Sequence, residues 1–172
     1  MKHAYIHKNL RELNFESQVI LGCHFLTLLA CFMPWFAATP AYEQVFWYNS
    51  FKGPGFMIGT VIFIISLLVV VTFLDRILER NVIKLPFSRN YVYLFAGVQQ
   101  IFLIVLMWSV LMATGSNYAD HSLRFGIFMA FAVQVCGLVA TFLNFQLEKQ
   151  KQAQSFFQHP ETPKPEAPHD KQ

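Results

Sequence analysis

Between Gly126 and Asn144, small or polar residues alternate with bulky apolar residues at helical spacing. Steps of three and four residues collect one set: Gly126, Ala130, Gln134, Gly137, Thr141 and Asn144. Steps offset by two residues collect the other set: Phe128, Phe131, Val135, Leu138, Phe142 and Phe145. The two sets lie on opposite faces of one α-helix. A soluble surface helix turns a polar face to water, so this pattern instead predicts a bulky face that meets lipid and a small face that meets a partner helix.

The chain contains four apolar blocks of similar length, at about residues 18–38, 56–74, 91–113 and 124–146. Each block is close to the ~20 residues that a helix needs to cross a bilayer. The 172-residue chain is 55% hydrophobic and 13% charged, which is about half the charge expected of a soluble domain. All ten acidic residues lie outside the blocks. We therefore predict an all-α integral membrane protein that folds as one four-helix bundle over residues 18–146.

The basic residues predict the orientation of this bundle. Of the 13 lysines and arginines, only Lys52, in the first connection, and Arg124, at the start of the fourth block, fall on the other side of the predicted membrane. The others lie in the two terminal segments and in the second connection. The positive-inside rule then predicts a multi-pass protein of the cytoplasmic (inner or plasma) membrane, with both termini cytoplasmic and two external loops. A cleaved signal peptide is disfavoured, because residues 1–17 are rich in charged and polar residues and no A-x-A site follows the first apolar run.

The terminal segments are predicted to lie on the cytoplasmic side. Residues 1–17 carry Ile6, Leu10 and Leu13 at helical spacing, which favours a short interfacial helix. His3 and His7 would share a face of that helix, but two ligands alone do not make a metal site. Residues 147–172 are rich in Gln, Lys, Glu and Pro, so we predict a disordered tail.

Small residues mark the helix faces that should pack most closely. Gly55 and Gly59 form a GxxxG pair at the start of the second block. Gly126, Ala130 and Gly137 form the small face of the fourth block. Because small residues let helix backbones approach closely, we predict helix-packing contacts at these five positions.

Four polar side chains fall at similar depths within the blocks: His24, Ser66, Gln100 and Gln134. Gln99 and Gln100 are about 100° apart on a helix, so only one is expected to point fully at the other helices. We hypothesise a polar layer inside the bundle. The simpler interpretation is structural, with hydrogen bonds across helices that contribute ~0.6 kcal/mol each on average. No intramembrane acid, lysine or arginine accompanies these side chains, which favours the simpler interpretation.

The first external loop, about residues 39–54, is rich in aromatic residues. Aromatic rings prefer the headgroup layer, so one interpretation is a loop that lies flat on the outer leaflet. The other is a docking surface for another protein, since Trp and Tyr are enriched in contact cores. The candidate docking residues are Tyr42, Phe46, Trp47 and Tyr48.

The sequence contains no recognisable catalytic or cofactor motif. Cys23, Cys31 and Cys136 lie within the apolar blocks and are interpreted as packing residues. A bis-histidine haem would need a second membrane histidine besides His24, and the blocks contain none. Zinc ligand sets, Gly-rich phosphate loops and Ser/His/Asp arrangements are also absent from the sequence. We predict a protein that is not an enzyme, carries no cofactor or metal and binds no nucleic acid.

The run Phe32-Met33-Pro34-Trp35-Phe36 ends the first block, and an external loop and a Gly-rich start of the second block follow it. In this layout, residues 18–146 resemble small four-span bacterial membrane proteins of uncharacterised function that carry Pro-Trp at the same place. The layout is also similar to that of claudin-like tetraspans. The paired loop cysteines and the Trp-rich motif of true claudins are missing, so the resemblance does not imply their barrier function.

These observations favour a non-enzymatic scaffold or accessory subunit. It would pack against a larger membrane assembly or against itself, through the GxxxG face, the aromatic loop or the tail. The alternative is a transport or small-ligand-binding module built around the polar layer. A scaffold should purify with a stoichiometric partner or as a defined oligomer, whereas a ligand module should purify alone and gain thermal stability from its ligand.

Overall fold

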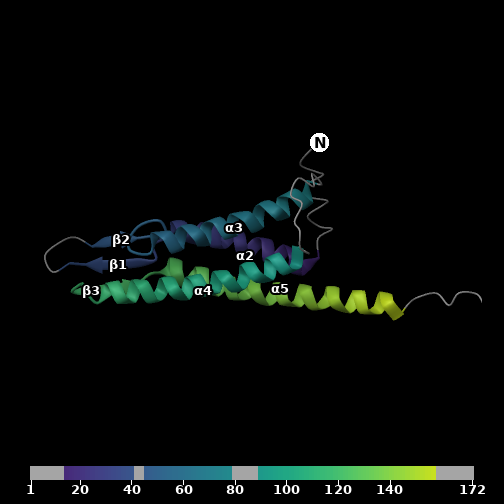
Figure 1. The fold of residues 1–172 in the computed structure, drawn as a ribbon. Helices are drawn as coiled ribbons and strands as arrows, with labels where there is room; N and C mark the ends of the chain where they lie inside the picture. The colour runs from purple at the N-terminus through teal and green to yellow at the C-terminus, as the bar shows by residue number, and fades with distance from the viewer. Residues whose placement is uncertain (1–13, 41–44, 79–88, 158–172) are drawn as a thin grey trace, which may run out of the picture.

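The computed structural model describes residues 14–40, 45–78 and 89–157. Four long helices dominate it, and they lie side by side along one axis (Figure 1). They are α2 (Phe15–Phe32), α3 (Phe56–Ile77), α4 (Arg89–Gly115) and α5 (Phe125–Phe157). All four are long and apolar enough to cross a membrane. The prediction of four apolar helices is confirmed, while the predicted interfacial helix in residues 1–17 falls almost wholly outside the described residues.

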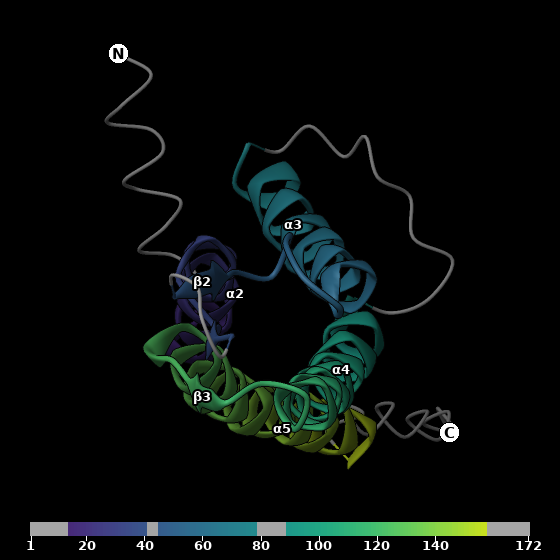
Figure 2. The same ribbon diagram turned by 90° about the vertical axis from the view of Figure 1, so that its left-hand side faces the viewer.

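The four helices form a ring in which each helix packs against two others. α2 contacts α3 and α5, and α4 contacts the same two helices on the other side of the ring. The end-on view shows this arrangement (Figure 2). Each helix therefore has one face toward the interior of the ring and one face toward the surroundings.

A three-stranded antiparallel sheet, which we did not predict, lies at one end of the bundle (Figure 1). The central strand β1 (Phe36–Thr39) pairs with β2 (Phe46–Tyr48) and with β3 (Asp120–Leu123). β1 and β2 come from the connection between α2 and α3, whereas β3 comes from the connection between α4 and α5. The sheet therefore joins the two helical hairpins, and the all-α prediction was incomplete at this end.

The first helix ends earlier than predicted, at Phe32 rather than near residue 38. Met33 precedes Pro34 and has an extended backbone, as expected because proline disfavours the α conformation in the residue before it. The indole N–H of Trp35 then folds back and donates a hydrogen bond to the carbonyl of Ala30 at 2.7 Å. The same carbonyl also accepts from the N–H of Met33 at 3.1 Å, so the end of α2 is held by two hydrogen bonds to Ala30.

The last helix is longer than predicted. It continues to Phe157, so residues 147–157 are helical and not disordered. The side chain of Asn90, at the start of α4, donates a hydrogen bond to the Glu148 carboxylate. The amide of Asn144 donates in turn to Asn90 at 3.3 Å. These bonds join α4 and α5 near and just beyond the end of the predicted fourth span. Residues 158–172 of the predicted tail lie outside the described residues.

The interior of the ring contains two separate apolar clusters. The cluster near the sheet includes Trp35, Ile104 and Met107. The cluster at the other end includes Ile20 and Phe73. The polar layer lies between them.

Candidate functional site

The four predicted polar residues lie inside the ring. His24, Ser66, Gln100 and Gln134 are each at most 1% exposed. The side-chain amide of Gln100 donates to the hydroxyl of Ser66 at 2.5 Å and to the carbonyl of Ile62 at 3.1 Å. These two bonds link α4 to α3.

Thr27 also belongs to this layer, although we did not include it in the prediction. Its hydroxyl lies 3.2 Å from Oε1 of Gln134 and 2.9 Å from the carbonyl of Cys23. The first contact links α2 to α5. A signal was present in the sequence, because Thr27 follows His24 by three residues and shares its helix face. The layer therefore contains two pairs across helices, one between Gln100 and Ser66 and one between Gln134 and Thr27.

The polar layer divides the apolar core along every helix. On α4, Gln100 lies between Ala96 of one cluster and Leu103 of the other. On α5, Gln134 likewise separates Ala130 from Ala140. A helix that shifted along its axis would leave these polar groups unpaired in an apolar interior, which is costly. The layer therefore favours one alignment of the four helices.

Three polar atoms of the layer have no hydrogen-bond partner among the described residues: Nδ1 of His24, Oε1 of Gln100 and Nε2 of Gln134. They come from α2, α4 and α5, and they include at least one donor and one acceptor. Leaving a buried polar atom unpaired costs ~1–3 kcal/mol. The layer thus keeps hydrogen-bonding capacity that a small polar ligand could use.

The GxxxG pair at the start of α3, Gly55 and Gly59, packs against other parts of the same chain. A Cβ atom at Gly55 would lie 2.0 Å from Sδ of Met107 on α4. A Cβ atom at Gly59 would lie 1.9 Å from the carbonyl oxygen of Ser50. Both glycines face neighbouring parts of the same protein, and the expectation that a partner also uses the GxxxG face stays a prediction.

The small face of α5 also packs within the chain. A Cβ atom at Gly126 would lie 2.7 Å from the carbonyl oxygen of Pro34, and one at Gly137 would lie 3.0 Å from Cβ of Cys23. Ala130 is fully buried. Together these residues bring α5 close to α2 and to the turn that follows α2.

Gln99 points out of the ring, unlike its neighbour Gln100. It is half-buried and lines an apolar groove of about 240 Å³ between α3 and α4. The other lining residues are Ile65, Leu68, Val69, Thr72, Val92, Phe95 and Ala96. The hydroxyl of Thr72 donates to the carbonyl of Val69 in its own helix at 2.7 Å. The amide of Gln99 makes no hydrogen bond to any described residue, so it is the free polar group of this groove.

The predicted docking residues belong to β2, except Tyr42, which lies outside the described residues. Phe46 and Trp47 are 43% and 56% exposed. The ring of Tyr48 stacks on Phe36, with 6.2 Å between ring centroids. A hydrogen bond with Tyr118, together with partial burial, raises the pKa of the Tyr48 hydroxyl above its usual value. The aromatic segment is therefore an edge strand of the sheet with two exposed aromatic side chains.

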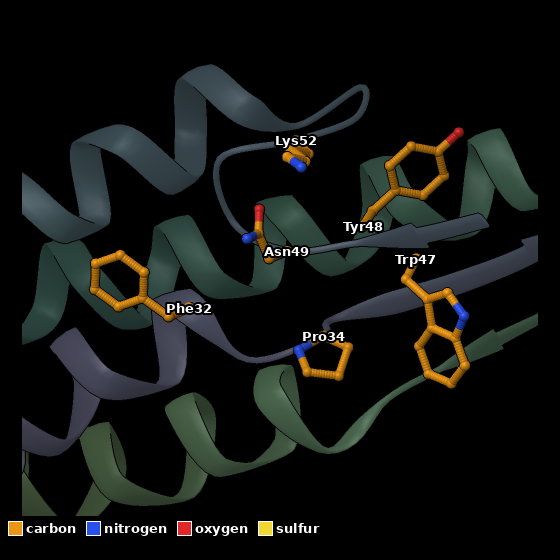
Figure 3. Close-up of a pocket in the computed structure, with 6 residues that line it drawn as sticks. All are labelled: Phe32, Pro34, Trp47, Tyr48, Asn49 and Lys52. Atoms are coloured by element: carbon orange, nitrogen blue, oxygen red, sulfur yellow. The ribbon is translucent and has the colours of Figure 1, made fainter.

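A pocket of about 320 Å³ lies beside β2 (Figure 3). It is lined by Phe32, Pro34, Trp47, Tyr48, Asn49 and Lys52. Trp47 and Tyr48 were identified from the sequence, but the pocket was not, because its lining depends on how α2, β2 and the following turn meet.

No family model, curated protein or solved structure matches this chain. Among the described residues, no three His, Cys, Asp or Glu side chains are grouped so that they could hold a metal ion. Function is therefore inferred from the geometry of the chain.

Proposed function

We propose that this protein is a non-enzymatic accessory or scaffold subunit of a membrane assembly and that it binds a transmembrane helix of its partner in the groove between α3 and α4. The observation that carries the proposal is the amide of Gln99, which faces outward in an apolar groove without a hydrogen-bond partner among the described residues. The partner is another membrane protein or a second copy of this chain.

The unpaired amide of Gln99 lies deep in the predicted membrane span, where acyl chains cannot hydrogen-bond to it. At 1.5 Å per residue, Gln99 lies roughly 15 Å along α4 from Arg89. That position is close to the middle of a hydrocarbon layer about 30 Å thick. Acyl chains offer no donor or acceptor to an amide, whereas a neighbouring helix can supply a Ser, Thr, Asn or Gln side chain. A bound helix would thus satisfy a group that lipid leaves unpaired.

The shape of the groove also suits a helix. Leu68 of α3 and Phe95 of α4 are 59% and 71% exposed and stand on its two sides. Val69 and Ala96 are buried at its base. Side-chain ridges of one helix pack into grooves of this kind, and the small Ala96 allows a close approach.

The charge distribution supports a location in the cytoplasmic membrane with the sheet on the external side. Lys52 and Arg124 are the only basic residues in the two connections that build the sheet. The remaining basic residues lie in the terminal segments, in the connection between α3 and α4, or near the helix ends farthest from the sheet. Such an imbalance favours cytoplasmic termini.

Affinity purification of the full chain from native membranes in mild detergent tests the proposal. Val92→Phe places a ring in the groove, whereas Ala132→Phe places the same ring at an exposed position of α5. We expect a stoichiometric partner, or a defined oligomer, with the wild type and with Ala132→Phe, and its loss with Val92→Phe. Retention of the full stoichiometry by Val92→Phe would show that the groove is not the docking site.

A second candidate function, a transport or small-ligand-binding module, is favoured by the three unpaired atoms of the polar layer. Such a protein would purify alone, and a ligand at 100 times its Kd would stabilise it by about 2.7 kcal/mol. Thermal unfolding with a panel of small polar ligands tests this function, with Gln134→Leu as the variant that should lose the gain. Absence of any ligand-dependent gain would exclude the candidate for the ligands tested.

A further inference from the structure

One aromatic side chain at the sheet end, Trp47, contacts Arg124 and lines the same pocket as Lys52. Cζ of Arg124 lies 4.7 Å from the centroid of the Trp47 ring. Lys52 lines the pocket that Trp47 also lines. Nε of Arg124 is buried and has no hydrogen-bond partner among the described residues. Among the described residues that line the pocket, none is acidic, so an anion bound there could balance the charge of Lys52.

The turn that follows β2 presents further hydrogen-bond donors to the pocket. Oδ1 of Asn49 accepts from the backbone N–H of Phe51 at 3.1 Å. The carbonyl of Asn49 accepts from the N–H of Lys52 at 3.2 Å. These bonds use the oxygens of Asn49 and leave the N–H groups of its amide for a ligand. Gly53 has a φ of +95°, a backbone conformation that favours glycine. It follows Asn49 and Lys52 in the same turn, and both of those residues line the pocket.

The other side of the pocket is apolar. Phe32, the last residue of α2, is 62% exposed. Its ring lies 5.3 Å from the ring of Phe51 and 5.8 Å from that of Phe63 on α3. Figure 3 shows Phe32 at one side of the pocket and Trp47 at the other, with Asn49 and Pro34 between them. The pocket therefore combines the amide of Asn49 and the cation of Lys52 with aromatic side chains at both ends, Phe32 and Trp47.

We propose that this pocket binds the headgroup of an anionic phospholipid in the membrane leaflet at the sheet end. The phosphate would accept hydrogen bonds from Lys52 and from the amide of Asn49, as phosphates commonly do from ammonium and amide donors. Arg124 adds a second positive charge beside Trp47, whose indole is typical of headgroup depth. The first acyl carbons would lie along Phe32. The site is remote in sequence and in fold from the α3–α4 groove, so it does not depend on the partner proposed for that groove.

Native mass spectrometry of the full chain in detergent can measure lipid binding directly. The protein is titrated with dioleoyl phosphatidylglycerol or with dioleoyl phosphatidylcholine, and the Kd of the first bound lipid is compared. We expect tighter binding of phosphatidylglycerol by the wild type and a loss of about fivefold in this preference with Lys52→Gln, the typical effect of one cation near an anionic lipid. Lys52→Arg should keep most of the preference. Lys149→Gln, at the opposite end of the bundle near Phe145, should keep all of it.

The proposal would be overturned by equal affinity of the wild type for the two lipids, by an unchanged preference in Lys52→Gln, or by an equal loss in Lys149→Gln. Displacement of phosphatidylglycerol by inorganic phosphate at comparable concentration would also overturn it, because the site would then recognise a free anion. Lys52 is exposed, so Lys52→Gln should keep the wild-type Tm.

Discussion

Gln99 and Gln100 are adjacent in the sequence and have opposite environments. Gln100 is fully buried and bonds to Ser66 and Ile62 of α3. Gln99 lies about 100° around the helix, in the outward groove, and has no partner among the described residues. The comparison indicates that two neighbouring glutamines have different roles. The inner amide aligns the helices of the chain, and we propose that the outer amide aligns the chain with another helix.

The same contrast extends to the small residues. Gly59 lies so close to the backbone of Ser50 that a methyl group would not fit, and a methyl group at Gly55 would require the side chain of Met107 to move. Ala96, in contrast, lies at the base of the outward groove. The two glycines therefore pack within the chain, whereas the groove between α3 and α4 leaves room for a further helix.

The largest expected effect is the loss of stability caused by a side chain at Gly59. Gly59→Ala would place a Cβ 1.9 Å from the backbone oxygen of Ser50, so we expect a loss of about 1–3 kcal/mol of stability. Gly22→Ala is the matched control, because a Cβ atom at Gly22 would have no atom within 4 Å beyond its chain neighbours and its own helix backbone, and alanine favours the helix by about 0.5–1 kcal/mol. Thermal unfolding in detergent measures both. Equal Tm values for the two variants would contradict the close packing at Gly59.

A smaller effect is expected in the polar layer. Thr27→Val keeps the shape of the side chain but removes the hydroxyl that contacts Gln134, leaving that buried amide with no partner. We expect a loss of about 1–2 kcal/mol, within the range for an unpaired buried polar group. Thr141→Val is the control, since its buried hydroxyl bonds only to Gly137 of its own helix. Unchanged thermal stability of both Thr27→Val and Gln134→Leu would contradict a polar layer that aligns the helices.

The smallest effect concerns the outer amide. Gln99→Leu removes an unpaired polar group from an apolar groove, so the Tm of the isolated protein should not fall. Association with the partner should weaken by about threefold, the equivalent of the ~0.6 kcal/mol average for a hydrogen bond between membrane helices. Val98→Leu, at a neighbouring exposed position, should change neither quantity. Dilution of the purified complex, followed by the fraction that remains assembled, measures the association.

The helical part of the fold was predictable because apolar blocks of bilayer length carry a strong signal. The division of α5 into two faces was predictable for the same reason. Ala130 and Gln134 are fully buried, whereas Phe128 and Phe142 are about half exposed. Helical spacing in one segment was enough to assign those faces, since it does not depend on the rest of the chain.

The sheet could not be predicted in the same way. Its strands have three or four residues, too few for an alternating pattern, and the Phe36–Thr39 segment continues the apolar run of the first block. Its pairing with Asp120–Leu123 joins residues far apart in the chain and depends on the helices that bring the two connections together. The groove was missed for a related reason. Helical spacing separates Gln99 from Gln100, but the positions of α3 and α4 decide which of them faces outward.

Site-specific photocrosslinking in native membranes tests the central claim most directly. A photoreactive phenylalanine analogue replaces Phe95, which lines the groove, or Phe25, an exposed residue of α2 on the other side of the ring. We predict a discrete crosslinked product at Phe95, none at Phe25, and a lower yield at Phe95 when Gln99→Leu is also present. Crosslinking to lipid alone at Phe95, or an equal yield of the same product at both positions, would contradict a helix-docking groove between α3 and α4.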